Sequence, residues 1–531
     1  MSERQHNILK SSMGVAFATL LSRLLGLVRV MFEAMVLGGG AFASAWQLAF
    51  MVPNLFRRLL GEGALGTALI PILTHTEARH GIERVRRDLS VVFAMLGVIL
   101  AMIVAVISLG AYLLRPLADS DYARMALHLL PLLMPYALFI CFIGVIGAIL
   151  NSRQTFFLPA LGALLLNVFL ISGLAFGFYR QSAGELGDIA QLLEQLSVLT
   201  LLSGLIQLIL MLALLYYRGV FPELSRAAFR NREVLSELWR LVLPGMIGGA
   251  ALQLSFVIDR LLAARLGPQA VPALTYTDRI IDLPIGIFAL SLGTVLMANM
   301  SRAAAKNDLE EMGRDLVFGL RQVYFICVPM AVFVVFFREP LLKLMFLRGN
   351  FSASDLAETS YVTIFYGAGI PAFCSLKVIL PAFYARKQMM RTLYASLTCI
   401  AVNIILNLIL MWPMRQGGIA LATVVSSMLN NTILLTMLQR EGINIGKATI
   451  VRSIGRALAA SLVAATLYFA YPAIAARLSF AYVGDLFGFL TVMGLFVLCY
   501  FILMRLFGSP EVGEILRLFI NKTRRRQHDS A

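Results

Sequence analysis

Charged residues are scarce in this sequence, and their scarcity excludes most soluble folds. Asp, Glu, Lys and Arg together make up 14% of the 531 residues, whereas 59% are hydrophobic and the mean hydropathy is +0.82. Ordinary soluble domains carry about 25% charged residues. The composition therefore predicts a polytopic membrane protein.

Residues for metal binding and covalent catalysis are also few. The five cysteines lie in apolar segments without CxxC spacing, and the five histidines form no metal or nucleophile constellation. The sequence has no P-loop, no GxSxG motif and no clustered loop carboxylates of the kind a lipid-linked glycosyltransferase needs. We therefore expect a transporter rather than an enzyme, without metal or cofactor, driven by an ion gradient or by the membrane potential.

Long apolar runs are what the sequence has in abundance. A bilayer core about 30 Å thick needs roughly 20 apolar residues per helix. Fourteen such windows predict an all-α fold with fourteen transmembrane helices. The windows lie near residues 11–32, 41–73, 89–114, 125–150, 156–178, 196–217, 238–264, 273–299, 317–337, 356–384, 392–412, 418–438, 457–476 and 484–507.

Basic residues give these helices an orientation. The tail KTRRRQHD at 522–529 marks its side as cytoplasmic, and an even number of spans places both termini there. Loops assigned to the inside, such as HTEARHGIERVRRD, carry three to five Lys and Arg each, whereas the outside loop GGGAFA has none. An outside loop with Arg338, Lys343 and Arg348 is an exception. Topology thus explains the net charge of +16, and we expect no nucleic-acid partner.

Two stretches of the chain resemble each other. LGGGAFASAWQLAFMVPNLFRRLLGEGALGTALIP and LGPQAVPALTYTDRIIDLPIGIFALSLGTVLMAN both open with LG, carry Pro and Arg midway and close on LGTxL. The closing glycines, Gly66 and Gly293, are 227 residues and six spans apart, so the two halves share an orientation. Parallel repeats around a central cavity are typical of transporters. We predict an N-terminal lobe at 1–220, a C-terminal lobe at 221–440, and a helix pair with a basic tail at 441–531.

Several ionisable residues fall at membrane depth, where they usually face a bundle interior or a wet cavity. They are Arg23, Arg29, Arg57, Arg58, Asp259, Arg260, Asp278, Arg279 and Asp282, with Lys377 apart in the tenth span. All but Lys377 lie in the first two helices of the two halves. An excess of arginine suits an anionic ligand, because guanidinium stays charged and offers a planar donor fork to phosphate.

Three of these arginines have a nearby carboxylate, so a purely structural ion pair is an alternative role. The pairs are Arg29 with Glu33, Arg260 with Asp259, and Arg279 with Asp282. By contrast, Arg57 and Arg58 have no acid nearer than Glu62, which can satisfy only one of them. A ligand-binding role is therefore favoured for these two.

The second span is unusually long, and the last two are unusually apolar. At about 1.5 Å per residue, the 33 residues of 41–73 would extend roughly 50 Å. Pro53, Gly61 and Gly63 offer places to break this helix. The stretches ALAASLVAATLYFAYPAIAA and FGFLTVMGLFVLCYFILM of the last two spans contain no Asp, Glu, Lys, Arg or His, which is typical of lipid-facing helices.

SRLLGLVR at 22–29, VPNLFRRLLGEGA at 52–64 and YTDRIIDLPIGIFALSLGTVL at 276–296 resemble the signature stretches of a known family. The family is the MurJ (MviN) lipid II flippases, within the multidrug/oligosaccharidyl-lipid/polysaccharide exporter superfamily. The resemblance implies two six-helix lobes plus a C-terminal pair in the bacterial cytoplasmic membrane. It implies flipping of lipid II, the undecaprenyl-pyrophosphate-linked peptidoglycan precursor, to the periplasmic leaflet by alternating access. It also implies a lipid-tail groove along the last two spans.

The resemblance also assigns roles to individual residues. Pyrophosphate binding falls to Arg23, Arg29, Arg57, Arg58 and Arg279; supporting cavity positions are Asn54, Asp282, Glu33, Asp259, Arg260 and Asp278. Relatives commonly carry acids where this chain has Val30 and Ser44. Glu33, four residues from Arg29, is the nearest substitute for such an acid.

Other functions remain possible on the sequence alone. A flippase for another polyprenyl-pyrophosphate glycan, such as an O-antigen or capsule unit, would need similar arginines. A cation-coupled drug exporter should carry uncompensated acids, whereas Asp259, Asp278 and Asp282 all have arginine neighbours. A membrane-embedded enzyme acting on a polyprenyl lipid lacks candidate catalytic loops. We expect a monomer whose partners are lipid II and membrane lipids.

Overall fold

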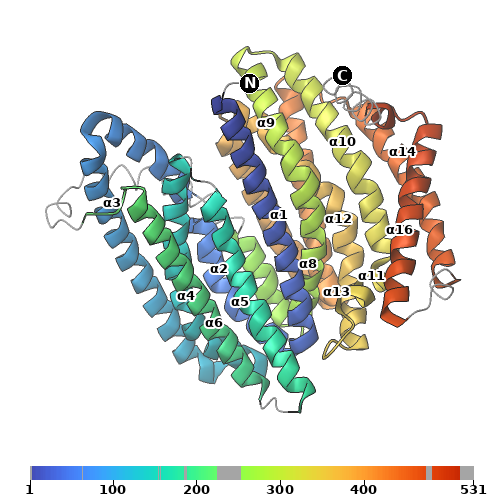
Figure 1. The fold of residues 1–531 in the computed structure, drawn as a ribbon. Coiled ribbons are helices and arrows are strands. Elements are labelled where there is room, and N and C mark those ends of the chain that lie inside the picture. The colour runs from blue at the N-terminus through green and yellow to red at the C-terminus, as the bar shows by residue number, and fades with distance from the viewer. Residues whose placement is uncertain are drawn as a thin grey trace, which may run out of the picture. The chain divides into compact units, whose positions relative to one another are not determined.

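The computed structural model describes residues 3–61, 64–153, 155, 157–184, 188–223, 253–473 and 481–514. Within these ranges the chain is helical and contains no strand. It divides into two compact units, residues 1–272 with 348–355, and residues 273–347 with 356–531. Figure 1 labels the helices of both units.

Unit 1 contains the first six long helices in chain order. They are α1 (Glu3–Leu37), α2 (Ala41–Phe56) with the π-helical turn η1 (Arg57–Gly61), α3 (Ala64–Leu114) with the 3-10 turn η2 (Arg115–Leu117), α4 (Asp121–Ser152), α5 (Phe157–Ser182) and α6 (Ile189–Tyr217). A further helical segment covers 253–264. The chain of α3 turns sharply at Gly81, where φ is +76°, a conformation that glycine adopts without steric cost.

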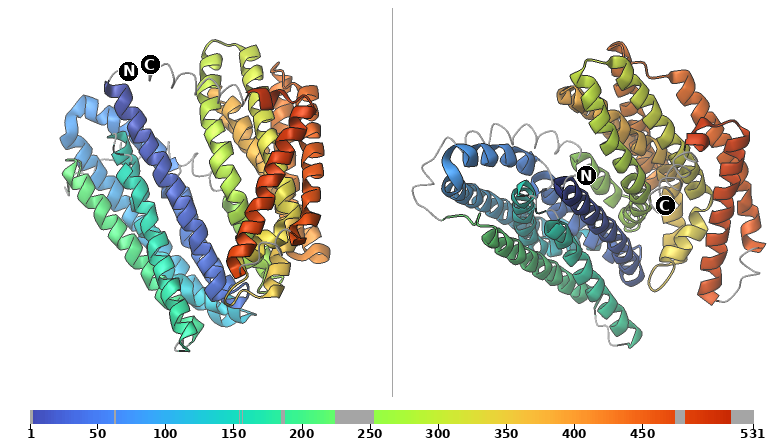
Figure 2. Two further views of the ribbon diagram at one scale, coloured as in Figure 1. Left: turned by 45° about the vertical axis from the view of Figure 1, so that its right-hand side comes forward. Right: turned by 45° about the horizontal axis from the view of Figure 1, so that its top comes forward.

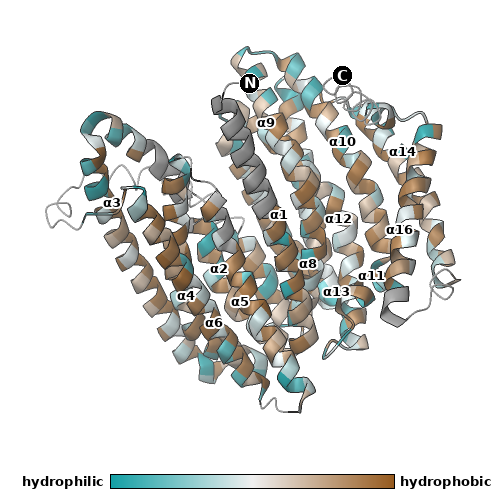
Figure 3. Ribbon diagram, viewed as in Figure 1, coloured by the Kyte–Doolittle hydropathy of each residue, from teal (hydrophilic) through white to brown (hydrophobic). Residues whose placement is uncertain are grey.

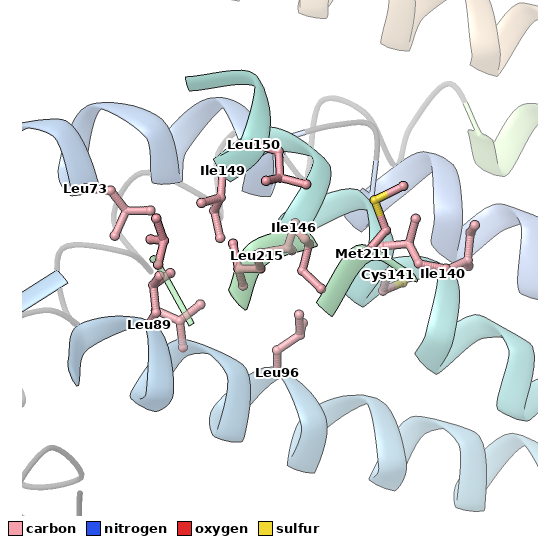
Figure 4. Close-up of a cluster of buried hydrophobic side chains, with 14 of the residues drawn as sticks. Leu73, Leu89, Leu96, Ile140, Cys141, Ile146, Ile149, Leu150, Met211 and Leu215 are labelled. Atoms are coloured by element: carbon pink, nitrogen blue, oxygen red, sulfur yellow. The ribbon is translucent and has the colours of Figure 1, made fainter. Parts of the chain in front are cut away.

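The core of unit 1 gathers around α4. Apolar side chains of α3, α4 and α6, including Leu96, Ile146 and Leu215, point toward one another in Figure 4. α4 is apolar on all faces, as expected of a helix enclosed by others. Its Cys141 Sγ lies 3.5 Å from the Phe56 carbonyl oxygen. The helix α4 therefore contacts the chain at the point where α2 ends and η1 begins.

The segment Arg348–Asp355 belongs to unit 1 although the helices on either side of it belong chiefly to unit 2. The Asn350 backbone N–H donates to the Met35 carbonyl oxygen at 2.8 Å, and its side-chain amide donates to the Val36 carbonyl oxygen at 2.7 Å. These bonds satisfy carbonyls in the last turn of α1, which have no partner within the helix. Gly349, at φ +60°, permits the close approach of the two backbones.

Unit 2 contains the remaining helices and most of α8. They are α8 (Ala270–Pro284) with the π-helical turn η4 (Ile285–Ala289), α9 (Leu290–Ala305), α10 (Leu309–Phe336), α11 (Arg338–Phe346), α12 (Ala353–Ala385), α13 (Met389–Arg440), α14 (Lys447–Ala465) with the 3-10 turn η5 (Thr466–Ala470), and α16 (Ala481–Leu506). Figure 2 shows them from two further sides. α13 breaks at Arg415, with φ 50° and ψ −136°, so it comprises two helices.

The C-terminal helices α14 and α16 pack against α10 through an apolar cluster that includes Phe325, Phe496 and Tyr500. The Tyr500 hydroxyl donates to the Phe325 carbonyl oxygen at 2.6 Å. In unit 2 the pair is thus joined closely to α10. The proposed division of the chain at 220 and 440 remains a prediction.

The all-helical membrane fold is confirmed. Ten helices in the described part are long and apolar enough to cross a membrane, and Figure 3 shows hydrophobic residues along the helices of both units. All fourteen predicted spans overlap helical residues of the described part, two of them within α13, which agrees with the expected number. Most of the seventh, 238–264, lies outside the described residues, as do Glu62 and Gly63. The sequence did not predict α11, whose nine residues are too few for a span.

Candidate functional site

A π-helical turn follows the first helical segment of each repeated stretch. Regular α-helix ends at Phe56 before η1 and at Pro284 before η4. Pro53 contributes to the first break and Pro284 to the second, since proline has no N–H to donate to the helical hydrogen bonds. Such π-helical turns are frequent at functional sites. The predicted break in the second span is therefore confirmed. The two turns differ in content, because η1 reads RRLLG and η4 reads IGIFA.

Arg57 opens the first of these turns. Its Nε donates to the Asn54 side-chain oxygen at 2.8 Å, three residues earlier on α2. Both side chains are half-buried. Asn54 therefore orients the guanidinium of Arg57 as a supporting residue would, and as a neutral acceptor it leaves the positive charge in place.

Arg58 contacts the helical segment 253–264. Its Nη1 donates to the Gln253 side-chain oxygen at 3.2 Å, and its Cζ lies 5.5 Å from the centre of the Phe256 ring. The Cζ of Arg260 lies 4.7 Å from the centre of the same ring. Sequence reasoning missed Gln253 and Phe256. Their spacing from Arg260 could have indicated them, because residues three, four and seven apart lie on the same face of a helix.

Arg29 lies in a different environment. Its Nε is 3.1 Å from Glu33 Oε1, and the two side chains are 9% and 6% exposed. Its Cζ lies 5.6 Å from the centre of the Phe50 ring, which stacks on Trp46. The predicted ion pair is thus present, so the Arg29 charge is compensated within unit 1. Glu33 thus lies within ion-pair distance of Arg29, as it must if Glu33 takes the place of an acid that relatives carry.

The two positions where relatives carry acids differ in their surroundings. Val30 is buried in the core of unit 1. The Ser44 hydroxyl donates to the Pro268 carbonyl oxygen at 2.6 Å. The Ser44 side chain therefore links α2 to the turn before α8 through a hydrogen bond. Arg23 and Asp259 also lie in unit 1, half-buried and buried respectively.

The remaining predicted residues lie in unit 2, on α8. Arg279 Nη1 is 3.8 Å from Asp282 Oδ2, with side chains 34% and 56% exposed. An ion pair so exposed contributes little to stability, and it leaves the guanidinium accessible. Asp278 is half-buried on the same helix. Lys377, which was not part of the predicted site, lies on α12.

The structure thus distributes the eleven predicted residues over both units. Unit 1 holds Arg23, Arg29, Glu33, Asn54, Arg57, Arg58, Asp259 and Arg260, and unit 2 holds Asp278, Arg279 and Asp282. Five arginines against two acids give the unit 1 set an excess of positive charge, which suits an anion. In the described part of the chain, no three His, Cys, Asp or Glu side chains gather as metal ligands would.

Comparisons with known proteins identify the family. The family model described as lipid II flippase MurJ matches residues 33–487. The chain is 30% identical over 488 residues to a probable lipid II flippase MurJ of Rhizobium meliloti, covering 90% of this chain and 89% of the relative. It is 28% identical over 449 residues to a counterpart from Vibrio cholerae, covering 82% and 84%.

Solved structures share the fold. A lipid II flippase MurJ in an inward closed conformation superposes with a TM-score of 0.74 at 20% identity, covering 92% of this chain and 98% of that one. An inward-facing multidrug resistance transporter of the MATE family gives a TM-score of 0.64 at 14% identity, covering 81% and 98%. The family match over most of the chain, together with the relative at 30% identity, establishes the relationship. This multi-pass membrane protein belongs to the MurJ family of lipid II flippases, which are transporters and not enzymes.

Proposed function

We propose that this chain flips lipid II by alternating access and holds the pyrophosphate of that lipid through arginine side chains. The observation that carries the proposal is the π-helical turn η1, in which Arg57 and Arg58 follow each other within the predicted second span. Asn54 and Gln253 each hold one of these guanidiniums through a neutral amide oxygen. Such an acceptor orients the donor fork without cancelling its charge.

The five arginines contribute unequally to this mechanism. Arg57 and Arg58 make the first contacts with the pyrophosphate, because they open the turn η1 and each donates to a neutral amide oxygen that orients its guanidinium. Arg23 and Arg279 add further positive charge, and the exposed pairing of Arg279 with Asp282 is weak enough to exchange for a phosphate. Arg29 forms an ion pair with Glu33 on α1. A bound pyrophosphate therefore competes with Glu33 for Arg29, and this competition affects how α1 packs.

The charge of the substrate also offers a driving force. A cytoplasm that is electrically negative favours outward movement of an anion, by about 2.3 kcal/mol per charge per 100 mV. A pyrophosphate diester with two negative charges would gain roughly 5 kcal/mol at 100 mV. An ion gradient is the alternative source of energy, and no cofactor is required in either case.

The surroundings of the protein form part of the proposal. We place it in the bacterial inner membrane as a monomer, with both termini in the cytoplasm. The basic tail at 522–529 supports that orientation. The outward faces of α14 and α16, which expose Val463, Phe487 and Leu498, are apolar enough to accompany the polyprenyl tail.

The test measures lipid II exposure on the periplasmic face of cells depleted of their own flippase. The wild-type gene should restore exposure, and Arg58→Ala and Arg279→Ala should not, at equal membrane levels. Arg124→Ala is the matched control, because Arg124 forms an exposed pair with Asp121. Failure of a well-inserted wild-type protein would refute lipid II as the substrate. It would favour another polyprenyl-pyrophosphate glycan.

A further inference from the structure

Two arginines lie where the polar beginning of α14 meets its apolar part. Arg452 and Arg456 come directly before the predicted span 457–476; Arg452 is exposed and Arg456 is half-buried. They are four residues apart, so their side chains lie one above the other on the same face of the helix. Basic residues at the end of an apolar span lie at the level of the lipid headgroups.

The same face of α14 continues as an apolar stripe. Ala459 and Val463 follow Arg456 at intervals of three and four residues, and both are exposed, Val463 at 50%. A different face of the helix, with Ala457 and Ala464, is buried within unit 2. The exposed face thus carries charge at one end and hydrocarbon along the span, as a phospholipid does.

The surface beside the two arginines is open. Gly455 lies between Arg452 and Arg456 in sequence, and a Cβ built on it would meet no atom within 4 Å. A headgroup can therefore approach both guanidinium groups over Gly455 without displacing a side chain.

The end of α16 adds a third arginine to this surface. Arg456 Nη1 donates to the Gly508 carbonyl oxygen at 3.2 Å, and the Gly508 N–H donates to the Arg505 carbonyl oxygen at 3.1 Å. Gly508 thus connects the polar end of α14 to the end of α16, and Figure 1 shows the two helices side by side. Arg505 itself is exposed. We call Arg452, Arg456 and Arg505 the basic patch.

The described carboxylates do not neutralise the basic patch. Among the residues that the structure describes, no Asp or Glu side chain lies within ion-pair distance of any arginine in the patch. The two acids that follow α16, Glu511 and Glu514, both pair with Arg321. The patch therefore attracts an anion at the membrane surface.

We propose that this surface binds an anionic phospholipid of the surrounding membrane, with the phosphate on Arg452 and Arg456 and an acyl chain along Ala459 and Val463. A guanidinium offers a planar two-donor fork to a phosphate. In the orientation proposed above, the lipid belongs to the cytoplasmic leaflet. The inference goes beyond lipid II transport, because it concerns a lipid that stays bound at the end of unit 2 where α14 and α16 meet.

A phospholipid fits this surface better than a lipid-linked sugar does. A large polar headgroup needs several well-placed polar side chains to fix its orientation. The exposed neighbours of the two arginines on α14 are apolar, and they include Val451 and Leu458, which are 68% and 42% exposed. A phosphate with a small headgroup and two acyl chains uses all that this surface offers.

The experiment locates the lipid by photo-cross-linking. The full-length protein is reconstituted in phosphatidylcholine nanodiscs that contain a varied fraction of phosphatidylglycerol with a diazirine in one acyl chain. Mass spectrometry then measures the cross-linked fraction of a peptide that covers 457–463. A phosphatidylcholine with the same diazirine is the comparison lipid, because it carries no net charge.

Three variants separate the charge from the shape of the surface. Arg452→Gln should raise the phosphatidylglycerol fraction needed for half-maximal cross-linking about fivefold, the usual effect of one basic residue near a membrane surface. Gly455→Leu keeps every charge and fills the open space, so it should also weaken cross-linking several-fold. Arg314→Gln is the matched control, because Arg314 is 66% exposed in the same unit and pairs with Glu310; it should stay within about twofold of the wild type.

The fold is checked by thermal unfolding in pure phosphatidylcholine, where Arg452→Gln and Gly455→Leu should match the wild type, since both positions are exposed. Wild-type cross-linking by Arg452→Gln would refute the inference, and so would equal cross-linking by the two diazirine lipids. Wild-type cross-linking by Gly455→Leu would show that the headgroup does not lie over Gly455, which also overturns it.

Undecaprenyl diphosphate distinguishes a phospholipid site from a substrate site. Unlabelled phosphatidylglycerol and undecaprenyl diphosphate are added in turn as competitors, and both should displace the label at similar fractions. If undecaprenyl diphosphate displaces it at a much lower fraction, the surface belongs to the transported lipid and the phospholipid site is refuted. Failure of the wild type to flip lipid II in cells would leave this result unchanged, because the cross-linking requires no transport.

Discussion

The carboxylate of Glu511 should stabilise the attachment of the C-terminal helices to unit 2. It is 1% exposed, and it accepts hydrogen bonds from Arg321 Nε at 2.8 Å, Ser453 Oγ at 3.0 Å and Ser509 Oγ at 2.5 Å. Arg321 lies on α10 and Ser453 on α14, while Glu511 follows α16. One carboxylate therefore links three elements of the unit.

The expected cost of removing this carboxylate follows from its contacts. Breaking a buried ion pair from one side costs about 3–5 kcal/mol. Arg321 keeps a second carboxylate, because Nη2 lies 3.3 Å from Glu514, which is 37% exposed. We therefore expect Glu511→Leu to destabilise the protein by about 2–3 kcal/mol, below the full range for a buried pair.

The assay is thermal unfolding of the purified protein in one detergent, read as a double-mutant cycle. Arg321→Met combined with Glu511→Leu replaces the pair by apolar side chains, and such replacements are often neutral. The double variant should therefore unfold closer to the wild type than Glu511→Leu alone. If Glu511→Leu unfolds at the wild-type temperature, or if the double variant is the least stable of the set, the reasoning is refuted.

Three further predictions follow from individual contacts. Gly349→Ala should destabilise the protein by about 2 kcal/mol or more, since the residue is at φ +60° and a Cβ there would overlap the Met35 carbonyl oxygen. The control in the same thermal unfolding assay is Gly26→Ala, because a Cβ at Gly26 on α1 would enter open space. Burial raises the pKa of Glu511, but hydrogen bonds from Arg321 and Ser509 outweigh it and hold the pKa below the ordinary 4.5. The stability difference between wild type and Glu511→Leu should thus be constant well above pH 4.5 and shrink as the pH falls below it, and a difference that grows on acidification would contradict this sign. Arg58→Lys should lower lipid II flipping in the cell assay at an unchanged membrane level, because lysine keeps the charge and loses the planar fork; wild-type flipping would show that charge alone suffices.

The fold was largely predictable because membrane helices leave a strong signal in sequence. Runs of about 20 apolar residues are required by the thickness of the bilayer, and this requirement predicted nearly all of the described helices. The signal contains nothing about features that depend on contacts. The nine-residue helix α11 and the association of Arg348–Asp355 with unit 1 both arise from packing, so neither appears in a hydropathy pattern.

The candidate site was predictable to a lesser degree, for a related reason. Arginines are conspicuous in apolar runs, so Arg57 and Arg58 stood out, and the spacing of Arg29 and Glu33 correctly predicted their ion pair. Phe256 was inconspicuous, because a phenylalanine in a membrane helix has the same composition signal as a lipid-facing residue. What Phe256 contacts depends on the side chain that packs against it, and only the structure places Arg58 against its ring.

The two π-helical turns indicate how a repeated architecture acquires a single kind of chemistry. The turns η1 and η4 follow the first helical segment at nearly the same place in the two repeated stretches, so both stretches depart from regular α-helix there. Only η1 carries charge, and the Cζ of its Arg58 lies over the Phe256 ring, whereas η4 consists of IGIFA. A π-helical turn widens the helix and presents its side chains differently from an α-helical turn whatever their chemistry. We propose that the break supplies the geometry in both halves, and that the two arginines at the start of η1 supply the affinity for an anion.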